Sequence, residues 1–193
     1  MNINIYKSCI IAHITKIVSL TDDEMDYVFS LFEIEKFNKG ELLFRENQVL
    51  DKHYFIYNGL LKLFFIDKDA KEHIIGFAIE DWWENDFEAF YKRKPTTMCL
   101  QAMEHTEVLS ITYTNYLELI TQLPKIEHFF LEKAYNGFIA AQKRIVSSLT
   151  SNASERYSQL IKQHPQWLQR IPKSQLALYL GVSRETLSRL NKK

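Results

Sequence analysis

Residues 173–190 read KSQLALYLGVSRETLSRL, a pattern of two short helices joined by a tight turn. Ala177 is small enough to let one helix approach the other closely. Gly181 supplies the positive φ that a sharp corner needs. Ser183 is a good N-cap for the second helix, which we expect over 184–191. The spacing therefore predicts a helix-turn-helix.

The second helix of this motif is expected to turn its leucines inward and its charges outward. Arg can form a bidentate pair with guanine, and Glu can accept a hydrogen bond from cytosine. Because a carboxylate repels phosphate, Glu185 favours base reading over nonspecific binding. A surface helix with incidental charges is the alternative. The start of the first helix is expected to hold phosphates. The predicted DNA-binding residues are Lys173, Ser174, Gln175, Ser183, Arg184, Glu185, Thr186, Ser188 and Arg189.

The charge distribution along the chain supports a polyanion partner. The 193 residues carry 24 basic and 24 acidic side chains. Residues 151–193 hold eight basic and two acidic ones, net +6, so the remainder holds 16 and 22, net −6. A basic end on an acidic body is typical of nucleic-acid binding, although a merely solvated tail is the alternative. The apolar content of 46% argues against a disordered chain.

Cysteine and histidine usage gives no support for a metal site or cofactor. Cys9 and Cys99 are too few for a disulfide framework or a four-thiolate cluster. The six histidines show no ligand-like spacing. No stretch approaches the roughly 20 apolar residues that cross a bilayer, and residues 10–20 make a poor signal peptide. We therefore expect a cytoplasmic protein without a membrane partner or cofactor.

The first two thirds of the chain are expected to form helices followed by a β-rich domain. Helices are predicted over 5–19 and 22–31. Short strands then follow at close spacing, which indicates an antiparallel barrel or jelly roll. Asn58-Gly59 predicts a type I′ hairpin. The expected strands are 53–57, 60–66, 72–79, 97–103 and 106–111, with a short helix over 84–91. Four aromatic residues are expected in the core rather than around a cavity: Trp82, Trp83, Phe87 and Phe90.

Helical periodicity returns after Tyr113. Helices are predicted over 113–122, 125–149 and 151–163. The long helix has two apolar faces, which favours contact with its own barrel on one side and a partner subunit on the other. Burial inside a single domain is the alternative. The first face consists of Phe130, Ala134, Gly137, Ala141, Ile145 and Ser148, and the second of Phe129, Tyr135, Phe138 and Ile139.

Three segments together resemble the Crp/Fnr family of bacterial transcription regulators. They are RIPKSQLALYLGVSRETLSRL (170–190), SERYSQLI (154–161) and GELLFRENQ…HYFIYNGLLKLFF (40–65). The resemblance implies an α+β fold: an N-terminal antiparallel β-roll or jelly roll (double-stranded β-helix) with flanking helices, a long dimerisation helix and a C-terminal (winged) helix-turn-helix. It implies an effector domain of the cyclic-nucleotide-binding type over 1–123, a dimerisation helix over 124–150 and a DNA-binding domain over 151–193. It also assigns base reading to Arg184, Glu185 and Arg189.

The sequence departs from the family pattern at two places. Effector-binding members carry a Gly-Glu pair and then an Arg-Ser/Thr pair that holds the cyclic phosphate. Those positions align with Glu84, Asn85, Thr96 and Thr97, so the guanidinium is missing. Cyclic AMP is therefore not the expected effector, because a buried anion needs charge-assisted donors. Only three residues follow Leu190, so any wing is expected around 165–173.

The sequence predicts a dimeric, sequence-specific regulator that binds a pseudo-palindromic operator in double-stranded DNA and is not an enzyme. RNA polymerase is an expected partner if the protein activates transcription. A sensor with a non-nucleotide effector in the β-roll is a compatible alternative. A β-barrel enzyme is a further one, which the absence of a catalytic constellation disfavours.

Overall fold

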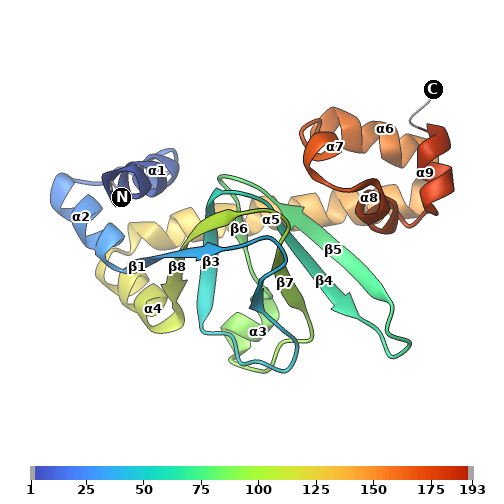
Figure 1. Ribbon diagram of the computed structural model, residues 1–193. Helices are drawn as coiled ribbons and strands as arrows, with labels where there is room; N and C mark the ends of the chain where they lie inside the picture. Colours follow the sequence, from blue (N-terminus) through green and yellow to red (C-terminus); the bar gives the residue numbers. More distant parts are fainter. Residues whose placement is uncertain (1–2, 191–193) are drawn as a thin grey trace.

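The computed structural model describes residues 3–190 as a β-roll between two helical regions (Figure 1). Helices α1 (Ile3–Thr15) and α2 (Asp22–Ser30) cover one end of the β-roll. Thr21 caps α2 in a capping box with Glu24. The predicted first helix ends at Thr15 rather than residue 19, because the amides of Ile17 and Val18 turn back onto the carbonyl of Ile14.

The β-roll consists of two four-stranded antiparallel sheets, as predicted. The sheet orders are β1-β8-β3-β6 and β2-β7-β4-β5. The strands are β1 (Phe32–Phe37), β2 (Leu42–Phe44), β3 (Lys52–Asn58), β4 (Leu61–Ile66), β5 (Glu72–Ala78), β6 (Trp83–Glu84), β7 (Cys99–Ala102) and β8 (Thr106–Thr112).

The predicted hairpin at Asn58-Gly59 is wrong, because the chain crosses there from one sheet to the other. Strand β3 pairs with β8 and β6, whereas β4 pairs with β5 and β7. Gly59 has φ +119°, but Asn58 is not in the positive region that a type I′ turn requires. A Cβ on Gly59 would lie 2.4 Å from Oγ1 of Thr106, so the crossing passes directly against β8. The tight hairpin lies instead at 67–71, between β4 and β5.

Aliphatic and aromatic side chains fill the inside of the β-roll. The short helix α3 (Phe87–Lys92) begins three residues later than predicted and lies between β6 and β7 along the chain. Phe90 is fully buried and Trp83 is half-buried, as expected. Trp82 and Phe87 are 39% and 46% exposed, so their placement in the core was wrong.

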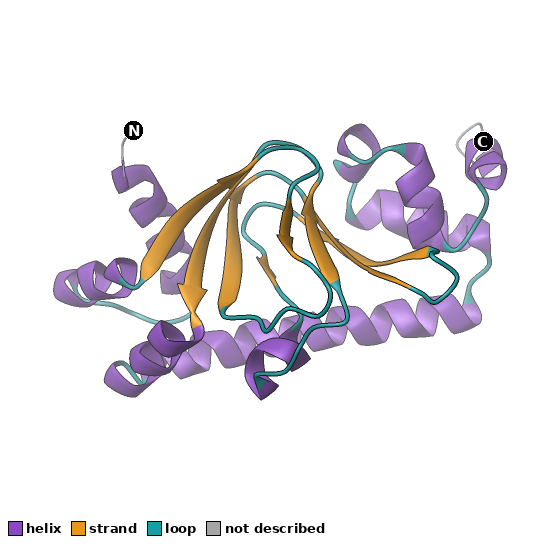
Figure 2. Cartoon of the chain, turned by 60° about the horizontal axis from the view of Figure 1, so that its bottom comes forward, coloured by secondary structure: helices purple, strands orange, loops and turns teal. Residues whose placement is uncertain are grey.

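The long helix α5 (Lys125–Thr150) follows α4 (Tyr113–Gln122) and runs under the β-roll to the C-terminal helices (Figure 2). Its buried residues are confined to the first two turns, at Ile126, Phe129 and Phe130. The alternative of a helix buried within its own chain is therefore wrong. An apolar strip is left exposed, consisting of Leu131, Tyr135, Phe138, Ile139, Ile145, Val146 and Leu149.

Four helices follow: α6 (Ala153–Gln163), α7 (Trp167–Arg170), α8 (Lys173–Leu180) and α9 (Arg184–Leu190). Helices α8 and α9 are the predicted helix-turn-helix; residue 191 of the predicted second helix lies outside the described residues. A wing over 165–173 is wrong, because α7 occupies that segment and no strand follows Thr112 within residues 3–190. Trp167, 2% exposed, anchors this turn in the core.

Candidate nucleic-acid interface

The corner between α8 and α9 is built as the sequence pattern requires. Gly181 adopts φ +67° and ends α8, and its N–H lies 3.1 Å from the carbonyl oxygen of Leu178. The N–H of Val182 donates to the carbonyl of Ala177 at 3.0 Å. Ala177 and Leu187 are each 2% exposed, so the two helices meet through side chains that exclude water. The position of α9 is thus fixed by α8.

Ser183 and Thr186 form a short hydroxyl chain at the start of α9. The backbone N–H of Thr186 donates to Oγ of Ser183 at 3.2 Å, which caps the helix. Arg189 donates from Nη2 to Oγ1 of Thr186 at 3.3 Å. The structure therefore brings these two predicted DNA contacts together as supports of the helix and of Arg189.

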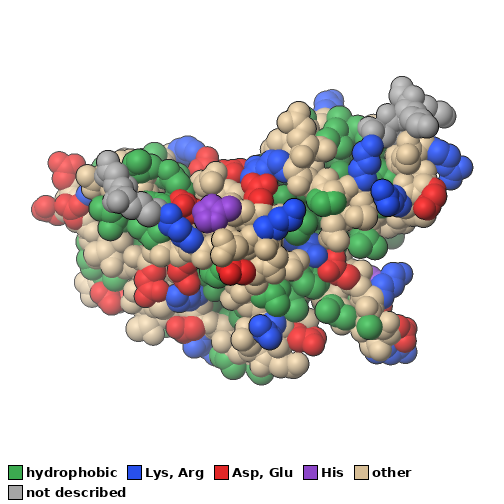
Figure 3. Space-filling view, viewed as in Figure 1, with side chains coloured by type: hydrophobic (Ala, Val, Ile, Leu, Met, Phe, Trp, Pro, Cys, Tyr) green, Lys and Arg blue, Asp and Glu red, His purple; other side chains and the backbone are tan. Residues whose placement is uncertain are grey.

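The outer face of α9 presents charged and polar groups to solvent. Arg184, Glu185, Ser188 and Arg189 are all exposed, in agreement with the sequence pattern. Backbone and Ser183 hydrogen bonds hold the pKa of Glu185 below its usual range, so Glu185 is an acceptor at neutral pH. Figure 3 shows Lys and Arg side chains gathered over the C-terminal helices.

The start of α8 is divided between solvent and the β-roll. Lys173 and Ser174 are exposed, as phosphate contacts would need to be. Gln175 is half-buried, and its Oε1 accepts a hydrogen bond from Nζ of Lys62 on β4 at 3.3 Å. Gln175 therefore contacts the β-roll, which the sequence did not indicate.

Two of the basic residues in the +6 segment serve the fold. Arg156 donates to the carbonyls of Ser151 and Leu180, which ties the start of α6 to the end of α8. Arg170 pairs with Glu80 and Glu104 of the β-roll. The basic residues of 151–193 are thus of two kinds: some are exposed to solvent, and others are bonded within the fold.

The predicted effector residues are only partly brought together. Asn85 is 1% exposed and donates to the carbonyl of Lys52 at 2.9 Å. Glu84 lies on β6, where desolvation raises its pKa to about 7. Thr96 is 1% exposed, whereas Thr97 faces solvent.

A residue outside the predicted set, Asp86, organises this region. Its Oδ2 accepts a hydrogen bond from Oγ1 of Thr96 at 2.7 Å. Its Oδ1 accepts from the N–H of Ala89 at 3.1 Å and caps α3. The start of α3 and the hydroxyl of Thr96 are therefore both already hydrogen-bonded to the buried carboxylate of Asp86. The N-cap pattern of Asp before Phe87 is the sequence signal that could have identified it.

The cations nearest this region are paired with carboxylates. Lys92 and Lys94 both contact Glu88, at 3.1 and 2.7 Å. Arg93 pairs with Asp51 at 2.9 Å and stacks over Tyr113. These basic side chains lie at the end of α3, away from the carboxylate of Asp86 that caps its start.

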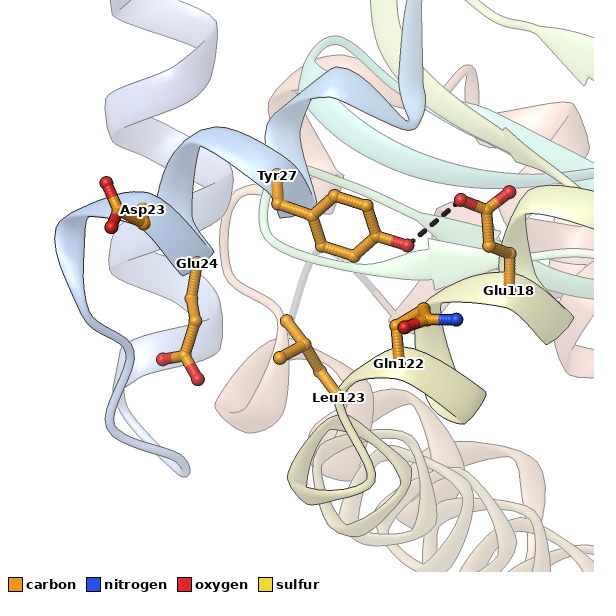
Figure 4. A pocket seen from close by; sticks show the side chains of 6 residues that line it. All are labelled: Asp23, Glu24, Tyr27, Glu118, Gln122 and Leu123. Carbon is orange, nitrogen blue, oxygen red and sulfur yellow. Dashed lines mark hydrogen bonds between the residues drawn. The ribbon is translucent and has the colours of Figure 1, made fainter.

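A hollow lies at the other end of the molecule. It measures about 370 Å³ and lies between α2 and α4 (Figure 4). Acidic side chains line it, and Tyr27 donates to Glu118 across it at 3.0 Å. Residues 3–190 contain no cluster of His, Cys, Asp and Glu suited to a metal ion. Among the helices of this range, none is long and apolar enough to span a membrane.

Comparison with known proteins finds similarity along most of the chain. Residues 34–122 match the family model of the cyclic nucleotide-binding domain. The chain is 26% identical over 199 residues to the transcriptional activator protein Anr of Pseudomonas protegens, covering 95% of this chain and 80% of Anr. It is 22% identical to the cAMP-activated global transcriptional regulator CRP of Salmonella typhimurium, covering 89% and 87%. Its fold is similar to that of FixK2 from Bradyrhizobium japonicum, with a TM-score of 0.73 at 13% identity and 83% coverage of each chain.

Proposed function

We propose that the chain is a Crp/Fnr-type transcription regulator that binds a pseudo-palindromic operator in double-stranded DNA as a homodimer, in line with its similarity to Anr and CRP. The exposed outer face of α9 carries this proposal. Arg184 and Arg189 read guanines, and Glu185 accepts from a cytosine. Lys173 and Ser174 hold phosphates at the start of α8.

The exposed strip of α5 supports a second copy of the chain as the partner. Leu131, Phe138 and Ile145 follow one another at intervals of seven residues, and Tyr135 and Leu149 are fourteen residues apart on the neighbouring seam position. Each is at least 45% exposed, which is costly for a helix that stays in water. A parallel pair of α5 helices covers both seams and places two α9 helices on one side, about 34 Å apart on successive major grooves.

In vitro selection from a random DNA pool tests this function. Recovery of a two-fold symmetric site supports it, whereas recovery of no preferred sequence contradicts it. On the selected site, Arg184→Ala should weaken binding by roughly 1–3 kcal/mol and relax the preference at one base pair. Lys162→Ala removes an exposed charge outside α9 and serves as the matched control, with a small loss on every sequence. Equal weakening of both variants on all sequences would exclude Arg184 as a base reader.

We infer that regulation does not depend on a cyclic nucleotide, although one relative is named cAMP-activated. The hydroxyl of Thr96 is already bonded to the buried carboxylate of Asp86. A cyclic phosphate placed there would face that carboxylate without a guanidinium to offset it. Titration calorimetry with cyclic AMP should give no saturable heat, and micromolar binding would overturn this inference.

The same reasoning extends to the setting in which the protein works. Since its target is DNA, we infer a cytoplasmic protein whose role is binding and not catalysis. The relative Anr is named an activator. If this chain also activates transcription, RNA polymerase is its further partner, which a pull-down with purified polymerase on operator DNA would detect.

A further inference from the structure

We propose that Arg170 is a specificity-determining residue that never touches DNA. It clamps the C-terminal helices to the β-roll and thereby fixes the half-site spacing that the dimer accepts. The inference rests on the proposed function, because spacing has meaning only for a dimer with two reading helices.

The clamp is a pair of ion pairs made by one guanidinium. Arg170 ends α7, and its Nη1 and Nη2 donate to the two carboxylate oxygens of Glu80, both at 2.8 Å. Nη2 also donates to Oε1 of Glu104 at 2.6 Å. Glu80 follows β5, and Glu104 lies in the turn between β7 and β8. Planar, bidentate pairing of this kind fixes orientation as well as distance.

One of the two acceptors is itself held in place. Glu80 accepts a further hydrogen bond from the N–H of Gly59 at 2.8 Å, so its carboxylate is anchored at the crossing between the sheets. The hydrogen bonds from Arg170 hold the pKa of Glu80 below its usual range against partial desolvation. Glu80 and Arg170 are therefore both charged at neutral pH.

An apolar layer lies beneath the clamp. Phe77 on β5 is 1% exposed and packs against Trp167 of α7 and Tyr179 of α8, with ring centroids 5.4 and 5.6 Å apart. The outer face of the second sheet and the C-terminal helices share one core in this way. Such contacts resist sliding less than they resist separation, since they are not directional.

Two further side chains, Lys62 and Arg144, add directional hydrogen bonds between the β-roll and the helices packed against it. Lys62 is 3% exposed, pairs with Glu72 at 2.9 Å and donates to Gln175 at the start of α8. From α5, Arg144 donates to the carbonyl of Ile74 at 3.1 Å. The C-terminal helices are thus bonded to β4, while α5 is bonded to β5.

Only residues 151–152 join α5 to α6 along the chain. Without lateral contacts, the reading helix could turn about this two-residue link. With the clamp closed, the orientation of α9 relative to α5 is fixed by the β-roll of the same chain. Because the dimer axis runs along α5, the clamp determines the distance and the rotation between two half-sites.

The test compares the wild type with the Glu80→Gln/Glu104→Gln variant, which keeps Arg170 and the apolar layer. Operators are built from the selected half-sites with separations changed by one and two base pairs. We expect the wild type to lose about tenfold or more in affinity per added base pair, and the variant about threefold or less. Affinity for a single half-site should agree within about twofold. The matched control is Glu118→Gln, which removes a carboxylate far from the clamp and should keep the wild-type spacing profile.

A measurement without DNA judges the clamp itself. The rate of tryptic cleavage after Arg170 should rise several-fold in the variant and stay unchanged in Glu118→Gln. An unchanged rate would show that the ion pairs do not hold α7, and an unchanged spacing profile with faster cleavage would refute the role in spacing. If the wild type selects no DNA, the proposed function fails and the spacing role with it, whereas the cleavage rate still decides whether the clamp exists.

Discussion

Replacing Asp86 by Ala removes a buried acceptor that serves two elements at once. The N-cap bond to Ala89 contributes about 1 kcal/mol to the free energy of unfolding. The charge-assisted bond from Thr96, between groups that are 7% and 1% exposed, contributes about 1.5–3 kcal/mol. Relief of the desolvation of the carboxylate offsets part of the sum. We therefore expect a net loss of about 2–3 kcal/mol, measured by urea unfolding followed through tryptophan fluorescence.

A matched cap without the buried partner provides the control. Thr112 caps α4 by accepting from the N–H of Asn115 at 3.1 Å. Thr112→Ala should cost about 1 kcal/mol, the value of a cap alone. In a double-mutant cycle, Asp86→Ala and Thr96→Val should couple by about 1 kcal/mol or more. The reasoning is refuted if Asp86→Ala costs no more than Thr112→Ala, or if the coupling is absent.

Three further outcomes follow from other parts of the structure. Phe138→Glu, at a position 62% exposed on α5, should leave the fold intact and convert a dimer to a monomer in sedimentation; an unchanged mass would exclude the exposed strip as the interface. Burial lowers the pKa of His53 to about 3, below the value of 6.5 that the residue has in an unfolded chain. The folded protein therefore has its full stability only above pH 6.5, where His53 is neutral in both states. Stability should fall as the pH drops below that value, on the order of 2 kcal/mol by pH 5, and His53→Phe should flatten the loss; an equal slope in both proteins contradicts it. Gly59→Ala combines a φ of +119° with a collision against Thr106, so a cost of about 2 kcal/mol or more is expected in urea unfolding, and a loss below about 0.5 would be inconsistent with the close approach.

The features that could be predicted are those set by neighbours in sequence. The helix-turn-helix depends on Ala177, Gly181 and Ser183 within seven residues, and the structure confirms all three roles. The caps of α2 and α4 and the hairpin between β4 and β5 are likewise local. Such elements can be predicted from the sequence because all the residues that form them are close together in it.

The errors in the fold come from choices between partners far apart in sequence. Asn58-Gly59 has the composition of a hairpin turn, but the pairing of β3 with β8 and of β4 with β7 takes the chain across to the second sheet. On α5, the second predicted face contributes Tyr135, Phe138 and Ile139 to the exposed apolar strip, whereas the predicted small-residue seam shares only Ile145 with it. A shift of one residue rotates a helix by about 100°, and only the contact with the β-roll fixes that rotation.

The site shows the same division. Arg184, Glu185, Ser188 and Arg189 were predicted to be exposed because helical spacing alone separates them from Leu187. Arg170 was not identified, because its partners lie 66–90 residues away, and the N-cap pattern at Asp86 does not reveal its bond to Thr96, ten residues on. An acidic run and a basic tail give the charges of these residues but not their pairing.

The shared core around Trp167 and Phe77 limits how the molecule can be dissected. A fragment cut at the link between α5 and α6 would expose Trp167 and Tyr179 on one piece and Phe77 on the other. Each fragment would expose an apolar surface that is buried in the intact chain. Aggregation of the fragments would therefore distort any DNA-binding measurement made on them. Crystallographic or solution work is best planned on the undivided chain.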